Sequence, residues 1–122
     1  MGFFDAPHEK IIGWSPAFFH APARLLIPVL DSTIAELGVP LSGRKLFRTV
    51  IIGRLALMTV QEASSSWSPT NLQLVRTYTE NAERAIPRAF QHLVPVATEV
   101  LLTAFGRAVT DASGRNPDPF IG

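Results

Sequence analysis

The sequence predicts an all-α protein, and three observations support that prediction. No stretch of useful length alternates apolar and polar residues in the way that a half-buried strand does. Apolar residues instead recur three and four positions apart, which is the spacing of one helical face. Ten prolines divide these periodic segments from one another. We therefore expect about four main helices, two of them bent at proline, packed as two antiparallel helical hairpins.

The N-terminal part of the chain is expected to begin with an extended arm over residues 1–13. The tripeptide Trp-Ser-Pro at 14–16 suits a helix start, because serine can cap a helix and proline fits its first position. A short helical turn is predicted near 16–21. A helix over 22–37 follows it, with a bend near Pro28.

The longest proline-free part of the chain contains the most informative helix, predicted over 42–63 with Ser42 as its cap. On a helical wheel, one broad apolar face of this helix carries a single charged residue, Arg54. We expect this face to be buried or to contact a partner. Its apolar members are Phe47, Val50, Ile51, Leu57 and Met58.

The C-terminal part of the chain predicts two more helices. A second Trp-Ser-Pro, at 67–69, starts a helix over 69–86 whose outer side is rich in Glu and Arg. A last helix is predicted over 88–112, with a bend near Pro95. The tail, residues 115–122, is rich in turn-forming residues, and we expect it to form an extended C-terminal arm.

Two short motifs recur along the chain at the same offset of 53 residues. Trp-Ser-Pro occurs at 14–16 and at 67–69, and Gly-Arg occurs at 53–54 and at 106–107. A duplicated helical hairpin would leave such self-similarity. The two halves are otherwise poorly matched, so coincidence is the better explanation, and duplication is the alternative.

The composition indicates one domain, residues 1–122, with apolar surface to spare. The chain is 47% hydrophobic with a mean hydropathy of +0.21, and only 17% of its residues are charged, against about 25% in typical domains. A chain of this size with that balance must expose apolar side chains, and such patches usually mark a partner or a membrane. The net charge of +1 argues against nucleic acid, whose binding domains usually carry a strong basic excess.

The apolar segments at 17–30, 46–60 and 93–105 approach the composition of a membrane span. Each is shorter than the roughly 20 residues that a span requires, and each contains charged or ionisable residues. We therefore expect buried or interfacial helices, with no transmembrane span of the chain's own.

Motifs for catalysis or metal binding are not evident. The absence of cysteine excludes disulfides, thiolate metal sites and cysteine nucleophiles. The histidines His8, His20 and His92 are isolated, and no metal-site spacing surrounds them. We expect His20 to pack or to hydrogen-bond among its aromatic neighbours. No Gly-rich phosphate loop or nucleophile elbow is present. We expect no catalytic residue, no metal and no cofactor, and a protein that is not an enzyme.

A basic cluster, Arg44, Lys45 and Arg48, lies at the start of the predicted 42–63 helix. One interpretation is an anion site, in which these cations and the backbone N–H groups bind the headgroup of an anionic phospholipid. The other interpretation is that the cations are solvated, or pair with Asp31 and Glu36 of the preceding helix. The second is slightly favoured.

Arg54 is costly on an apolar face unless a carboxylate pairs with it. Glu99 on the last helix is one expected partner. The alternative is an acidic group of another subunit, in which case the apolar face is a protein interface, since interface centres are rich in arginine and aromatic residues. The residues assigned to this interface are Arg54, Phe47, Ile51, Met58, Trp14 and Trp67.

These features together predict a non-catalytic accessory subunit of a larger membrane-associated protein complex. A respiratory-chain or ATP-synthase type of complex would suit the chain, which would lie peripheral to an energy-transducing membrane such as the mitochondrial inner membrane. Its partners would be other protein subunits and an anionic phospholipid. The alternative is a small helical carrier or sensor that binds an apolar ligand between its hairpins, in a pocket lined by Phe47, Met58, Leu101 and Phe105.

Overall fold

A computed structural model describes residues 7–60 and 67–115, and each regular element in these two ranges is a helix. The all-α class is therefore confirmed, whereas the predicted number of four main helices is wrong. In chain order the elements are α1 (Pro7–Trp14), α2 (Ala17–Leu25), α3 (Ile27–Glu36), the short 3-10 helix η2 (Leu41–Gly43), α4 (Arg44–Met58), α5 (Pro69–Ala85), α6 (Arg88–Gln91) and α7 (Leu93–Arg115).

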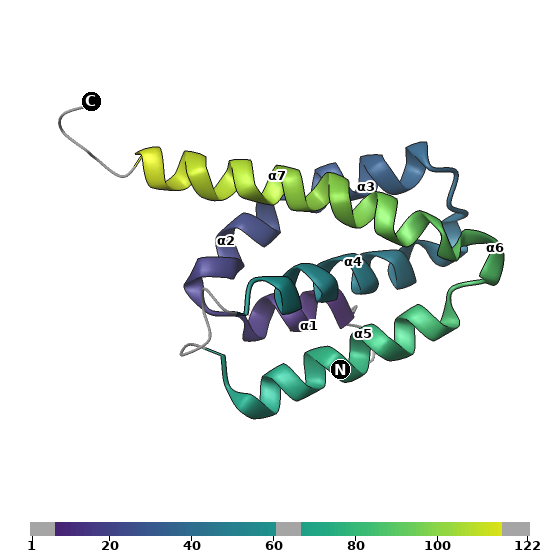
Figure 1. Ribbon diagram of the computed structural model, residues 1–122, viewed down its shortest axis with the longest axis horizontal. Helices are drawn as coiled ribbons and strands as arrows, with labels where there is room; N and C mark the ends of the chain where they lie inside the picture. The colour runs from purple at the N-terminus through teal and green to yellow at the C-terminus, as the bar shows by residue number, and fades with distance from the viewer. Residues whose placement is uncertain (1–6, 61–66, 116–122) are drawn as a thin grey trace.

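Helix α4 lies at the centre of the molecule, and α1, α3, α5 and α7 all pack against it. Figure 1 shows α5 on one side of α4, with α3 and α7 on the opposite side. Helices α3 and α7 also contact each other, and α2 contacts α7. Elements from both halves of the chain thus surround one helix, so the predicted arrangement as two separate hairpins is not supported.

The burial of α4 extends around the whole helix, which a single apolar face does not explain. A helix that is apolar on all sides is a core helix. Phe47, Val50 and Ile51 are buried as expected, but Leu57 is only half-buried and Met58 is 48% exposed. The buried residues of α4 are Phe47, Thr49, Val50, Ile51, Ile52, Gly53, Leu55 and Ala56.

The predicted N-terminal arm is wrong for residues 7–13, which belong to α1. Ile11 and Ile12 are buried there, and α1 packs on α4. Burial of this apolar pair explains the helix, because an isolated helix of eight residues would be unstable in water. The C-terminal arm predicted over 115–122 starts within a helix, since α7 continues to Arg115. The remainder of both predicted arms lies outside the described residues.

Helices are interrupted two or three residues before the prolines at which we expected bends. The chain breaks at Leu26, two residues before Pro28, and at His92, three residues before Pro95. A proline is tolerated in the first turn of a helix, where its missing N–H would have no partner. Each new helix therefore starts just upstream of its proline. Pro22 was expected to start a helix, but it lies inside α2.

The three serines expected to cap helices differ. Ser15 does not cap α2, which begins after Pro16 without a side-chain cap. Ser68 caps α5, because its side chain accepts a hydrogen bond of 3.3 Å from the Asn71 N–H. Ser42 does not cap the central helix. It lies in η2, and α4 begins after Gly43 without a side-chain cap. At the other end, α4 stops at Met58, and residues 61–63 of the predicted helix are not among the described residues.

The recurring motifs at an offset of 53 residues do not occupy equivalent positions. The Ser68 side chain starts α5, whereas the Ser15 hydroxyl donates to the Ile12 carbonyl at 2.6 Å, at the end of α1. Gly53 is buried against α5, whereas a Cβ at Gly106 would meet nothing within 4 Å. These differences favour coincidence over duplication.

Gly53 allows α4 and α5 to approach closely. A Cβ at this position would overlap the hydroxyl of Thr79 and lie 3.0 Å from the Thr79 Cβ. Thr79 is 3% exposed, and its hydroxyl already donates to the Val75 carbonyl at 2.7 Å. The Thr79 side chain therefore cannot move aside without disturbing α5.

We predict that Gly53→Ala destabilises the protein by about 1–3 kcal/mol or more, because overpacking a rigid core forces the backbone to shift. The matched control is Gly106→Ala, at a helical glycine with open space around it. This control should be neutral or stabilising by up to about 1 kcal/mol, because alanine favours the helix. Urea unfolding of both variants measures the difference. Equal stability of the two variants would contradict the proposed close packing.

Candidate functional site

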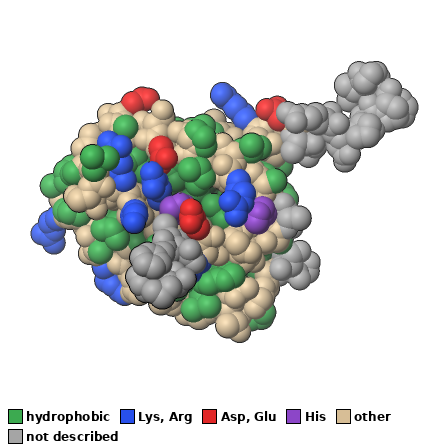
Figure 2. All heavy atoms as spheres, turned by 180° about the vertical axis from the view of Figure 1, so that it is seen from behind, with side chains coloured by type: hydrophobic (Ala, Val, Ile, Leu, Met, Phe, Trp, Pro, Cys, Tyr) green, Lys and Arg blue, Asp and Glu red, His purple; other side chains and the backbone are tan. Residues whose placement is uncertain are grey.

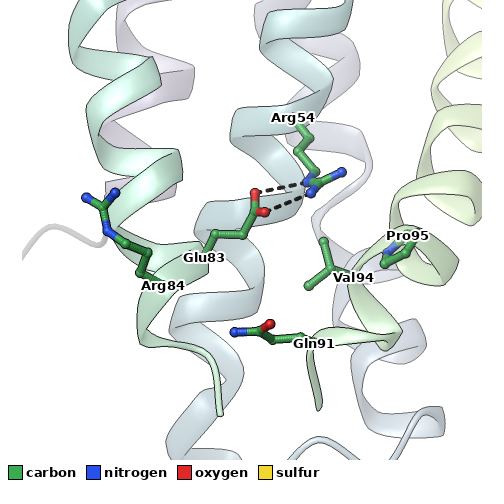
Figure 3. Close-up of a pocket in the computed structure, with 6 residues that line it drawn as sticks. All are labelled: Arg54, Glu83, Arg84, Gln91, Val94 and Pro95. Carbon is green, nitrogen blue, oxygen red and sulfur yellow. Dashed lines mark hydrogen bonds and ion pairs between the residues drawn. The ribbon is translucent and has the colours of Figure 1, made fainter. Parts of the chain in front are cut away.

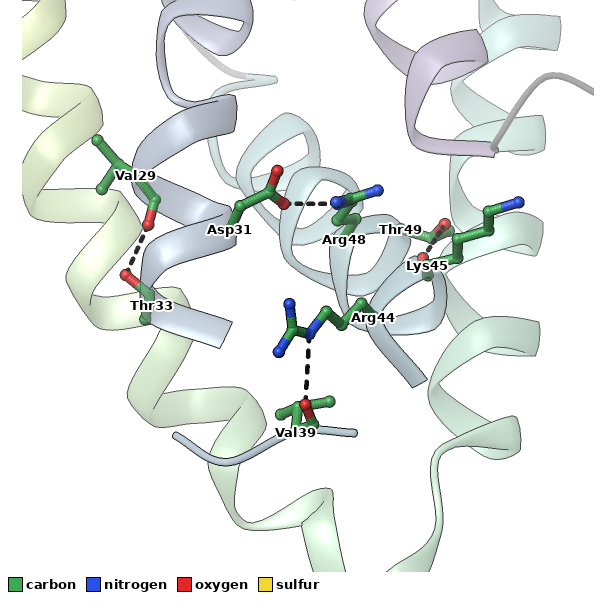
Figure 4. A network of polar contacts seen from close by, with 8 residues as sticks. All are labelled: Val29, Asp31, Thr33, Val39, Arg44, Lys45, Arg48 and Thr49. Atoms are coloured by element: carbon green, nitrogen blue, oxygen red, sulfur yellow. Dashed lines mark hydrogen bonds and ion pairs between the residues drawn. The ribbon is translucent and has the colours of Figure 1, made fainter. Parts of the chain in front are cut away.

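The cations at the start of α4 point in different directions. Arg48 pairs with Asp31 of α3, with its Nε atom 2.6 Å from Oδ1, and Arg44 donates from Nε to the Val39 carbonyl at 3.4 Å (Figure 4). Lys45 points away from both arginines in this view. It lines a small hollow of about 240 Å³ between α1, α4 and α5. The arrangement does not gather the three cations around one anion.

The interpretation that these cations pair with carboxylates of the preceding helix is therefore confirmed for Arg48, which pairs with Asp31. Glu36 is exposed, and the described residues give it no ion pair. Arg44 and Lys45 retain solvent contact and can still reach an anionic surface.

Arg54 forms a bidentate ion pair with Glu83 of α5. Its Nε and Nη2 atoms lie 3.1 and 2.9 Å from the two carboxylate oxygens (Figure 3). The expected pairing with Glu99 is wrong, and so is the need for an acidic group from another subunit. The Glu83 carboxylate offsets the free-energy cost of partly desolvating the Arg54 guanidinium beside the core.

A pocket of about 380 Å³ adjoins this ion pair between α4, α5 and the start of α7. Its polar groups already have partners within the chain. Arg84 points away from the pocket in Figure 3 and donates to the Asn81 side chain at 2.5 Å. The Gln91 amide donates to the Ile86 carbonyl at 3.2 Å. This pocket therefore presents a neutralised arginine and no set of groups arranged for catalysis.

Three of the six residues assigned to the partner interface, Phe47, Ile51 and Trp67, lie in the core. Phe47 and Ile51 are 1% and 0% exposed. Trp67 is buried beside Phe19, with their ring centroids 6.1 Å apart. Trp14 is half-buried and stacks on Tyr78 with the centroids 5.8 Å apart. Of the apolar residues in the predicted interface, Met58 alone is classed as exposed.

Part of the exposed apolar surface flanks α7, whereas the two most exposed apolar side chains, Leu41 of η2 and Leu25 of α2, do not line the grooves described next. Two grooves follow α7. The end groove, about 240 Å³, lies between α2, the end of α4 and α7, and the α3–α7 groove, about 550 Å³, lies between the two helices that name it. The end groove is lined by Phe18, Met58, Thr59, Leu102, Phe105, Gly106 and Val109. The α3–α7 groove is lined by Val29, Glu99, Val100, Thr103, Ala104 and Arg107.

The segment Arg88–Asp111, which contains most of α7, is long and apolar enough to cross a membrane by length and composition. The mean hydropathy of its most apolar 18-residue window is 1.4, and 28% of that window is buried in the protein. Figure 1 shows the C-terminal end of α7 projecting beyond α2. On the face opposite to that view, charged and histidine side chains gather near the centre, with hydrophobic side chains in separate patches around them (Figure 2).

Comparisons with known proteins provide no assignment. No protein-family model, curated protein or solved structure matches this chain. Within the described ranges, no group of three or more His, Asp or Glu side chains could hold a metal ion.

His20 has the hydrogen-bonding role expected of it. Its Nδ1 atom lies 3.0 Å from the Ile12 carbonyl, and its Nε2 atom accepts from the Arg24 Nε at 3.1 Å. These partners fit the neutral ring with its proton on Nδ1. The ring thereby connects α2 to the end of α1.

His8 is a buried residue of α1 and lies near the basic cluster. It is 5% exposed, and no described residue hydrogen-bonds its Nδ1 atom. Burial lowers the pKa of His8 below its ordinary value of 6.5, and the nearby Arg48 and Lys45 also lower it, whereas Glu9 and Asp31 oppose the shift. The folded protein therefore holds this ring neutral.

We predict that stability falls as the pH decreases below 6.5, because the unfolded chain binds a proton there that folded His8 does not bind. The loss ends once the pH passes below the lowered pKa of the folded state. Urea unfolding at about pH 7.5 and about pH 5.5 measures it. His8→Gln should reduce the difference between the two pH values, whereas His92→Gln, at an exposed position, should retain it. An unchanged difference in His8→Gln would refute this assignment.

Proposed function

We propose that this chain is a non-catalytic accessory subunit of a larger membrane-associated protein assembly. The observation that carries this proposal is the end groove, an open apolar hollow in which Phe18 and Met58 are 37% and 48% exposed. A groove of this kind suits an apolar side chain or helix of a partner protein. Exposed aromatic and methionine side chains favour such contacts, because both bury a large area on binding.

Partner binding explains this surface better than an enclosed ligand does. The carrier hypothesis requires a pocket between helices lined by Phe47, Leu101, Met58 and Phe105. Phe47 and Leu101 are fully packed in the core, at 1% and 0% exposed. Met58 and Phe105 instead line the end groove at the surface. The exposed position of Met58 therefore favours the accessory-subunit proposal.

The proposed setting is the surface of an energy-transducing membrane, in a complex of respiratory-chain or ATP-synthase type. The high apolar fraction and the low charge content of the chain support a protein that works within an assembly. An anionic phospholipid, if present in that assembly, would contact Arg44 and Lys45, because Arg48 is paired with Asp31. Other subunits of the complex would cover the end groove.

We predict that the purified chain binds mild detergent through the end groove. Size-exclusion chromatography with light scattering, with and without detergent, gives the mass of detergent bound per chain. Met58→Glu should reduce it severalfold, because a carboxylate in the groove is costly to desolvate. Leu74→Glu is the matched control, since Leu74 is 38% exposed on α5 outside the groove, and it should bind detergent like the wild type.

Mass spectrometry of the same samples tests the lipid contact. Co-purification of an anionic phospholipid that is lost in the variant Arg44→Ala with Lys45→Ala would support it. A chain that binds neither detergent nor phospholipid would overturn the proposed function.

A further inference from the structure

The α3–α7 groove exposes a regular stripe of α7. Val96, Val100, Thr103 and Arg107 follow one another at spacings of four, three and four residues, and all four are exposed. This is the spacing of the contact face in a pair of packed helices. Val29 of α3, which is 38% exposed, forms the opposite wall. The groove can therefore receive a second helix alongside α7.

Two opposite charges lie on this surface at equal distances from Thr103. Glu99 is four residues before it and Arg107 is four residues after it, so the two are about 12 Å apart along the helix axis. That separation is too large for them to pair with each other. Both line the groove, and the described part of the chain provides neither with an ion-pair partner.

We propose that this chain forms a two-fold symmetric dimer in which the α7 helices pack antiparallel, centred on Thr103. An antiparallel copy places its Arg107 beside Glu99 and its Glu99 beside Arg107, so each charge has one partner and two ion pairs form in the interface. Val96 and Val100 supply the apolar contacts. The partner is thus a second copy of this chain, on a surface separate from the end groove.

A membrane fits this surface less well than a second copy does. Glu99 and Arg107 would each enter hydrocarbon without a partner, which is costly for both. The opposite face of α7 packs into the core through Val94, Ala97 and Leu101, so insertion would also require α7 to leave its neighbours. Dimerisation pairs the charges and keeps the core intact. Because the contact is one short helical stripe, we expect weak association, roughly in the micromolar range.

Sedimentation equilibrium of the full chain and of its charge-reversal variants, over a range of concentrations, tests the dimer. Glu99→Arg and Arg107→Glu should each weaken self-association by about tenfold or more, because like charges then face each other twice. The double variant should restore it. Mixing the two single variants should give a heterodimer, since one carries two arginines and the other two glutamates at these positions. Glu80→Arg, at an exposed site on α5, is the control and should associate like the wild type.

Other outcomes would overturn the dimer. A wild type that stays monomeric at high concentration would do so, as would single variants that associate as strongly as the wild type. A monomer that binds neutral phosphatidylcholine vesicles and loses this binding in Val100→Glu would assign the groove to lipid instead. The result is independent of the end groove: a dimer that binds neither detergent nor phospholipid would support this inference while contradicting the proposed function.

Discussion

The burial of α4 from every side is the constraint on which the rest of this fold depends. Between Phe47 and Ala56, buried residues occur on every side of this helix, so other helices must cover it. Helices α1 and α3, with eight and ten residues, are too short to be stable alone, and their contacts with α4 supply the missing free energy. The two arginines Arg48 and Arg54 occur where α4 reaches the surface. Each has a carboxylate from a covering helix, which limits the cost of a charge beside the core.

The fold class could be predicted from the sequence because helical spacing and proline positions are local signals. The details that failed depend on tertiary contacts. The segment 7–13 has too few residues to show a period, and burial of Ile11 and Ile12 decides its structure. The predicted buried face of α4 was too narrow. A helical wheel compares the hydrophobicity of one face with that of another, so it cannot indicate that other helices cover every face. Proline breaks were misplaced by two or three residues, because a proline is best accommodated inside the first turn of the next helix.

The candidate site could be predicted only in part. Arg54 was recognised because a cation on an apolar face requires a partner. Glu83 was not, since it is 29 residues away and belongs to the charged side of its own helix. Met58 and Phe105, two of the pocket residues expected from the sequence, line the end groove, whereas no lining residue of the α3–α7 groove was expected to form a pocket. The existence of both grooves depends on how much of α7 is covered by α2, α3 and α4, which periodicity within α7 cannot show. The exposed side of α7 is bordered by Phe18 of α2 and Met58 of α4 in one groove, and it carries the opposite charges Glu99 and Arg107 in the other.

Gly53 and Arg54 are adjacent in α4, and their partners Thr79 and Glu83 are one turn apart in α5. One contact is purely steric and the other is electrostatic, yet both fix the same alignment of the two helices. Sliding α5 by a residue would break the ion pair, and a larger side chain at position 53 would meet Thr79. The side chains at positions 53 and 79 therefore constrain each other's size. A sequence that preserves this packing must keep the combined volume of the side chains at positions 53 and 79 small, even where every other residue around them has changed.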